Sequence, residues 1–127
     1  MNGLDTNVLV RFLVDDDEEQ AGRARRAIAD GGSFHIGTIV LCELVWVLER
    51  SYAYPKARIA DVLDRLLRAD KFSVERRDDA WLALAGYRDG QGGFADGLIA
   101  LAAIDAGCGA VLTFDKGLKR MPGFKQL

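Results

Sequence analysis

The chain has 127 residues, of which 50% are hydrophobic and 28% are charged, and its net charge is −2. This composition is typical of a single globular domain over residues 1–127, and it excludes a disordered chain and a protein coated in positive charge. No apolar run is long enough to span a membrane and no secretory signal is visible, so we expect no membrane association and a cytoplasmic location.

Short strand candidates alternate with helices along the chain. After a first strand at 2–4, Asp5 stands where a helix begins, and further strand candidates lie at 34–36, 72–74 and 110–114. Helices are expected at 18–30, at 38–54, from Pro55 onward, at 78–88 and at 94–106. Strands separated by helices predict an α/β fold with a parallel sheet and helices on both of its sides.

Acidic residues follow the first and last of these strands. Asp5 comes after the strand at 2–4, and Asp115 comes directly after "AVLTF". Ligands of such sheets gather beyond the carboxyl ends of the strands, so both carboxylates are candidates for a site. Asp5 could equally cap the helix that follows it.

Glu43 is the one polar residue among the ten residues 39–48 of "TIVLCELVWVLER". A helix that is apolar all round is expected to be buried, and a buried carboxylate needs a partner. A salt bridge, a metal or catalytic role, and exposure on a helix edge all remain open for Glu43.

Asp96 opens an apolar helix in "GGFADGLIALAAI" and is either its N-cap or a site residue. Asp105 lies at the far end of that helix, and the acidic run that begins at Asp15 is interpreted as solvated. If the fold brings Asp5, Glu43, Asp96 and Asp115 together, a divalent cation must relieve their repulsion. Oxygen ligands of this kind favour Mg²⁺ or Mn²⁺ over zinc.

The remaining residues support no other catalytic chemistry. His35, the only histidine, lies in a strand candidate and is interpreted as a packing residue, so a serine or cysteine mechanism has no base. Cys42 and Cys108 are far apart in apolar surroundings, which predicts two buried thiols in a reducing compartment. Carboxylates and a metal ion activate water and stabilise phosphoryl charge, so the sequence indicates phosphoester hydrolysis.

Four segments of the chain carry a family resemblance. "GLDTNVLVRFL", the "CE" of the helix at 38–54, "FADGLIALAA" and "LTFDKGLKR" together resemble the PIN-domain ribonucleases, and more narrowly the VapC-type toxins of bacterial toxin–antitoxin pairs. The resemblance covers nearly the whole chain, with the four motifs in order. It implies a three-layer α/β/α fold with a central parallel sheet of about four to five short strands.

The resemblance also implies a function. It implies an endoribonuclease that depends on Mg²⁺ or Mn²⁺, with Asp5, Glu43, Asp96 and Asp115 as metal ligands and catalytic residues. The supporting polar contacts map onto Thr6, Asn7 and Thr113. A homodimer and an antitoxin protein that covers the active site are implied as well.

RNA binding requires positive charge near the acids. Lys116, Lys119 and Arg120 follow Asp115 directly and are the expected phosphate contacts, with Arg11 as a further candidate. The apolar residues Trp46, Val47, Tyr52 and Tyr54 either pack inside the domain or form a surface for the antitoxin or for a second copy of the chain.

Three rival functions fit the sequence less well. A receiver-type phosphoacceptor domain needs a pair of acids after the first strand, but Thr6 follows Asp5 here. A haloacid-dehalogenase-type phosphatase needs Asp-x-Asp, but position 7 is Asn7. A non-catalytic PIN-like binding module remains the main alternative, and metal titration separates it from an enzyme.

Overall fold

The computed structural model describes residues 1–127, which divide into two compact units. The first unit contains Met1–Tyr54 and Arg65–Glu75, and the second contains Pro55–Asp64 and Arg76–Leu127. The chain passes between the units three times, and the second crossing falls within helix α4, Lys56–Arg68. None of the helices combines the length and the apolar character that crossing a bilayer requires.

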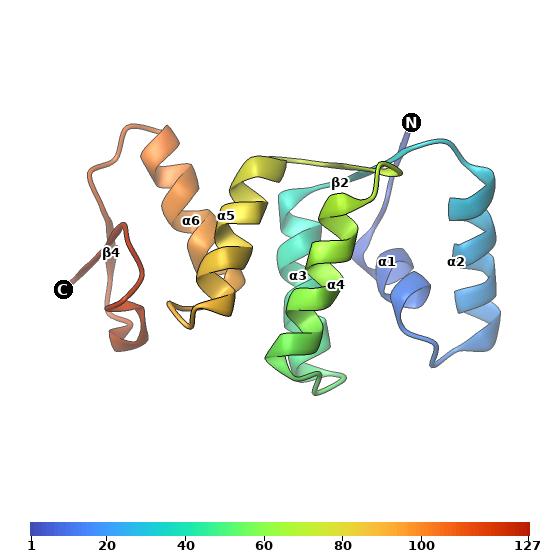
Figure 1. Ribbon diagram of the computed structural model, residues 1–127, viewed down its shortest axis with the longest axis horizontal. Coiled ribbons are helices and arrows are strands. Elements are labelled where there is room, and N and C mark those ends of the chain that lie inside the picture. The colour runs from blue at the N-terminus through green and yellow to red at the C-terminus, as the bar shows by residue number, and fades with distance from the viewer. The chain divides into compact units, whose positions relative to one another are not determined.

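The first unit is built on a three-stranded parallel sheet in the order β1-β2-β3. The strands are β1 (Asn2–Gly3), β2 (Phe34–Ile36) and β3 (Phe72–Val74). The helices α1 (Thr6–Leu13), α2 (Glu18–Asp30) and α3 (Thr38–Arg50) belong to the same unit, and α1 packs against both α2 and α3 (Figure 1). The core of this unit includes the fully buried side chains of Leu9, Ile36, Leu41, Leu44 and Leu48.

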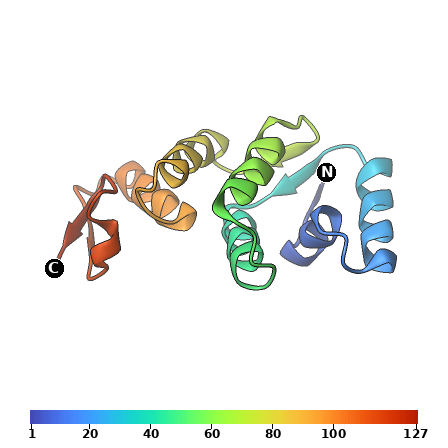
Figure 2. The same ribbon diagram turned by 60° about the horizontal axis from the view of Figure 1, so that its bottom comes forward.

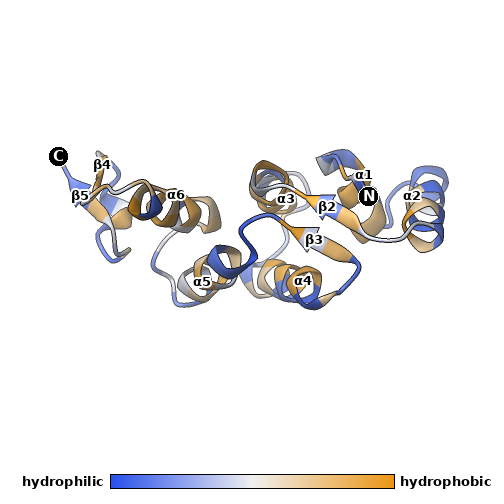
Figure 3. Ribbon diagram, turned by 90° about the horizontal axis from the view of Figure 1, so that it is seen from above, coloured by the Kyte–Doolittle hydropathy of each residue, from blue (hydrophilic) through white to orange (hydrophobic).

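The second unit pairs helices α5 (Arg77–Arg88) and α6 (Phe94–Asp105), which lie side by side in Figures 1 and 2. It continues with β4 (Val111–Thr113), a 3₁₀ helix (Lys116–Leu118) and β5 (Phe124–Gln126), and β4 and β5 form a parallel pair. Most of α6 is hydrophobic in Figure 3.

Gly97 explains how closely α5 and α6 approach each other. A Cβ atom at this position would lie 3.2 Å from the Cβ atom and 3.3 Å from the Cα atom of Ala83. Glycine costs about 1 kcal/mol relative to alanine inside a helix, so this residue weakens the first turns of α6 taken alone. The close packing of the two helices explains why a glycine occupies this position.

The expected α/β class with short parallel strands is confirmed. The predicted bounds of α2, β2 and β3 agree with the structure, whereas β5 was not predicted. The five strands lie in a three-stranded and a two-stranded sheet.

Helix α3 departs from the prediction in two ways. It ends at Arg50 rather than at residue 54, because Ala53 adopts a left-handed conformation with φ of 50° and the Tyr54 amide donates to the Leu48 carbonyl at 3.0 Å. It is also not buried all round, since Ile39 is 76% exposed and Trp46 is 55% exposed. The buried residues of α3 therefore form one face of the helix.

The prediction of two buried cysteines is wrong for Cys108, which is exposed after the end of α6. Cys42 is half-buried, and desolvation raises the pKa of its thiol.

Candidate active site

Asp5 occupies the junction between β1 and α1. Its backbone is extended and it holds the N-cap position of α1, but its carboxylate makes no capping hydrogen bond. The side chain is exposed at the carboxyl end of the sheet. This carboxylate therefore does not cap α1, and both of its oxygens remain available to a ligand.

Glu43 lies close to the start of α1 although it belongs to α3. The Thr6 hydroxyl donates a hydrogen bond of 2.8 Å to Oε1 of Glu43. The fully buried residues Leu41 and Leu44 anchor α3 on either side of Glu43 in the sequence. The side chain of Glu43 is exposed, so the expected burial is wrong and the alternative of exposure on a helix edge is confirmed. Its partner is a hydroxyl group and not a basic residue.

Asp96 is the third residue of α6, and the N-cap position belongs to Gly93. The prediction that Asp96 is the N-cap is therefore wrong, because the helix begins three residues earlier. Oδ2 of Asp96 instead accepts a hydrogen bond of 3.2 Å from the Gly93 amide, which satisfies a donor that the helix leaves unpaired. The side chain is half-buried.

Asp115 follows β4 and caps the 3₁₀ helix. Its Oδ1 accepts from the Gly117 amide at 2.8 Å, and its own amide donates to the Thr113 hydroxyl at 3.0 Å. The Gln126 side chain on β5 donates to the Asp115 carbonyl at 2.7 Å. The unpredicted strand β5 therefore contributes to holding this aspartate in place.

The four acids share one chemical feature. Asp5 makes no side-chain hydrogen bond, and each of the other three uses one carboxylate oxygen within the protein and leaves the second oxygen uncommitted. Asp5 and Glu43 belong to the first unit, and Asp96 and Asp115 belong to the second. Within either unit, no group of three or more His, Cys, Asp or Glu side chains lies at metal-binding distances.

The basic residues expected to contact RNA differ in whether a carboxylate already pairs with them. Lys116, Lys119 and Arg120 are exposed and pair with no carboxylate. The segment that carries these basic residues lies beside the loop that leads into α6. Its residues Leu118 and Met121 come so close to Gly92 that a Cβ atom there would lie 2.8 Å from their side chains.

Arg11 is engaged in a cluster that the sequence did not indicate. Its guanidinium donates to Asp16 at 2.8 Å, to Gln20 at 2.7 Å and to Tyr52 at 3.3 Å, and the Tyr52 hydroxyl donates to Asp16 at 2.6 Å. Asp16 is exposed, as the interpretation of the acidic run as solvated expects, but its carboxylate is also paired. In the same run, Asp17 caps α2 by accepting from the Gln20 amide at 3.1 Å.

The cluster is expected to make the stability of the fold depend on pH in the acidic range. The Tyr52 hydrogen bond lowers the pKa of Asp16 below its ordinary value of 3.8; desolvation opposes this shift, and the charge of Arg11 adds to it. A carboxylate with a depressed pKa stabilises the fold above its unfolded pKa and loses that contribution as the pH falls through the folded value.

We therefore expect the stability difference between the wild type and Asp16→Asn to shrink as the pH is lowered from about 5 to about 2. Urea unfolding at each pH measures this difference. Tyr52→Phe removes the hydroxyl that makes the largest contribution and keeps the ring, so it should flatten the same pH dependence. A difference that stays constant over this range would contradict the assignment.

Comparisons with known proteins cover nearly the whole chain. The PIN domain profile matches residues 4–123, a range that contains all four candidate acids. The VapC ribonuclease of Aquifex aeolicus (strain VF5) is 30% identical over 129 residues, which cover 98% of this chain and 94% of that protein.

Proposed function

Because the chain belongs to the PIN domain family, we propose that it is an endoribonuclease that depends on Mg²⁺ or Mn²⁺ and acts as the cytoplasmic toxin of a toxin–antitoxin pair. The similarity to a VapC ribonuclease over 98% of the chain supports this assignment. The observation that carries the chemistry is the uncommitted carboxylate oxygen on each of the four acids.

The residues present suit a hard divalent cation. Asp5, Glu43, Asp96 and Asp115 offer only oxygen atoms, which Mg²⁺ and Mn²⁺ prefer, and no cysteine or histidine belongs to the proposed set. We propose these four residues as the metal ligands and catalytic residues. When bound, the ion would supply an activated water and offset the charge that develops on the phosphoryl group.

Surrounding groups hold three of these four carboxylates, and Asp5 is the exception. Thr6 holds the Glu43 carboxylate through the 2.8 Å hydrogen bond to Oε1 and leaves Oε2 uncommitted. The Gly93 and Gly117 amides do the same for Asp96 and Asp115. Groups that hold metal ligands in this way typically change metal affinity or activity by about 10- to 100-fold when they are removed.

Substrate and partners follow from the same assignment. We propose that Lys116, Lys119 and Arg120 contact RNA phosphates, because their charges are exposed and unpaired beside Asp115. The guanidinium of Arg11 is shared with Asp16, which makes it a weaker candidate for the same role. We further propose a homodimer and an antitoxin protein that blocks the active site.

Metal-dependent cleavage of RNA tests the proposal. The purified chain is expected to cut single-stranded RNA in the presence of Mg²⁺ or Mn²⁺ and to stop when EDTA removes the ion, as followed by gel electrophoresis. Calorimetric titration with Mn²⁺ separates an enzyme from a binding module that holds no metal. RNA that stays intact with Mn²⁺ present, to the same extent as with Asp5→Asn, would reject the enzyme.

A further inference from the structure

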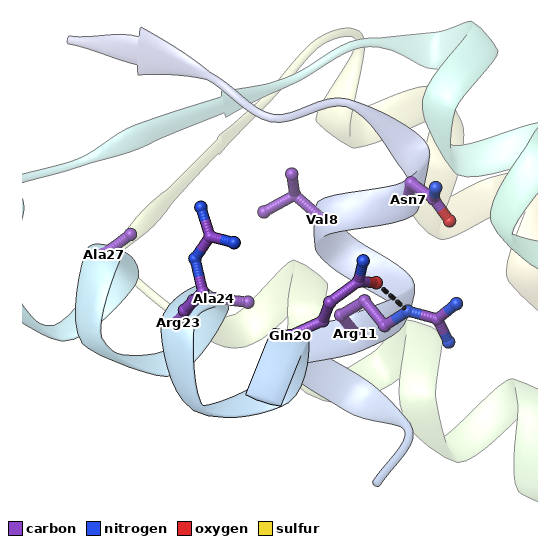
Figure 4. A pocket seen from close by; sticks show the side chains of 7 residues that line it. All are labelled: Asn7, Val8, Arg11, Gln20, Arg23, Ala24 and Ala27. Carbon is purple, nitrogen blue, oxygen red and sulfur yellow. Dashed lines mark hydrogen bonds between the residues drawn. The ribbon is translucent and has the colours of Figure 1, made fainter. Parts of the chain in front are cut away.

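A groove of about 430 Å³ lies between α1 and α2 within the first unit (Figure 4). Its polar lining comes from two helical faces: Asn7 and Arg11 on α1, and Gln20 and Arg23 on α2. Val8, Ala24 and Ala27 supply the apolar part of the lining. The groove falls within the range of about 300–1,000 Å³ that is usual for ligand pockets.

The groove is positively charged. Two of its lining residues are arginines and none is acidic. Arg11 shares its charge with Asp16, which is 2.8 Å away. Arg23 is exposed and has no carboxylate partner, so its full charge is available to a ligand. This charge pattern favours an anionic occupant.

The neutral residues of the groove suit a nucleotide better than a simple anion. The Asn7 side-chain amide makes no hydrogen bond within the protein, and the Gln20 amide uses only its oxygen, which accepts from Nε of Arg11 at 2.7 Å. Free amide groups can pair with the edges of unstacked bases, and arginine planes can stack on them. The short side chains of Ala24 and Ala27 leave room for a flat ring.

The groove also begins next to the candidate active site. Asn7 is two residues beyond Asp5, in the first turn of α1, and Arg11 is one turn further along the same face. The groove thus leads away from Asp5 over about 6 Å of helix between Asn7 and Arg11.

We propose that this groove binds one nucleotide of a single-stranded RNA, with Arg23 on its phosphate and with Gln20 facing its base. The inference rests on the proposed ribonuclease function and adds a binding subsite to it. Arg23 and Gln20 are thereby positioning residues for the substrate and do not touch the reacting atoms.

Equilibrium binding to a fluorescent single-stranded RNA tests the subsite without any cleavage. Measured in an Asp5→Asn background, Arg23→Ala is expected to weaken binding about tenfold, as the loss of a hydrogen bond to a charged group does. Because one phosphate contact disappears, the slope of log K against log salt should fall by about 0.7. Arg23→Lys keeps the charge and should keep the slope.

Arg25→Ala is the matched control. It removes a charge of the same sign from the same helix, but two residues further on and therefore about 200° around the helix axis. Arg25 pairs with Asp15 at 3.5 Å and does not line the groove. It should leave the affinity for RNA and the salt slope unchanged.

The outcomes separate the subsite from the enzyme. An unchanged affinity and slope in Arg23→Ala would overturn the subsite even if the wild type cuts RNA. Loss of binding to a co-expressed protein partner, with RNA binding intact, would overturn it in favour of a protein-docking groove. A wild type that binds RNA through Arg23 but cuts none would reject the nuclease and leave the subsite standing.

Discussion

The Asp5→Asn variant is expected to cleave RNA at least about a hundredfold more slowly than the wild type. Asp5 places an exposed, uncommitted carboxylate at the carboxyl end of β1. The substitution removes the negative charge that would bind a cation and keeps the shape of the side chain. Initial rates of cleavage of a labelled RNA at saturating Mn²⁺ measure the effect.

The fold of this variant should be unchanged, because asparagine is as good an N-cap residue as aspartate. Asp70→Asn provides the control. Asp70 precedes β3 and therefore lies at the amino ends of the strands of the same parallel sheet, whereas Asp5 lies at their carboxyl ends. The control should cleave RNA like the wild type. Equal rates in Asp5→Asn and Asp70→Asn would remove Asp5 from the mechanism.

Leu44→Ala is expected to lower the free energy of unfolding by about 2–5 kcal/mol. Leu44 is fully buried in the core of the first unit and directly follows Glu43. Truncation removes apolar contacts and leaves a cavity that the neighbouring leucines fill only in part. Denaturant unfolding at neutral pH measures the loss.

Ile39→Ala is the comparison on the same helix. Ile39 is 76% exposed, so its truncation should change the free energy of unfolding by no more than about 0.5 kcal/mol. Similar losses in the two variants would mean that the buried face of α3 is not the one described here.

Local signals explain which parts of the fold could be predicted. The glycine pair after Asp30 is the local signal for the end of α2, and the structure adds Asp17 as a side-chain cap at its start. β2 and β3 are short apolar segments between turn residues, and their predicted bounds are confirmed.

The missed features depend on contacts that no local pattern encodes. The end of α3 rests on Ala53 in a left-handed conformation that usually selects glycine, so Pro55 was a misleading stop signal. β5 is a three-residue segment with only Phe124 as a strong strand former, and it exists through its pairing with β4.

The candidate site also contains residues that local pattern could identify and contacts that it could not. Asp5 and Asp115 could be found because each lies two residues after the end of a strand. The hydrogen bond from Thr6 to Glu43 joins residues 37 positions apart, and the one from Tyr52 to Asp16 joins residues 36 positions apart. Periodicity and spacing describe neighbours along one element, so they cannot reveal such pairs.

The cluster around Arg11 has a consequence for the groove beside it. Asp16 offsets the charge at one point of the lining, while Arg23 keeps its charge on the facing helix. The electric field along this wall is therefore lopsided, and a polyanion sliding over it meets its strongest attraction on the α2 side. The phosphate backbone of a bound strand would therefore lie closer to α2 than to α1.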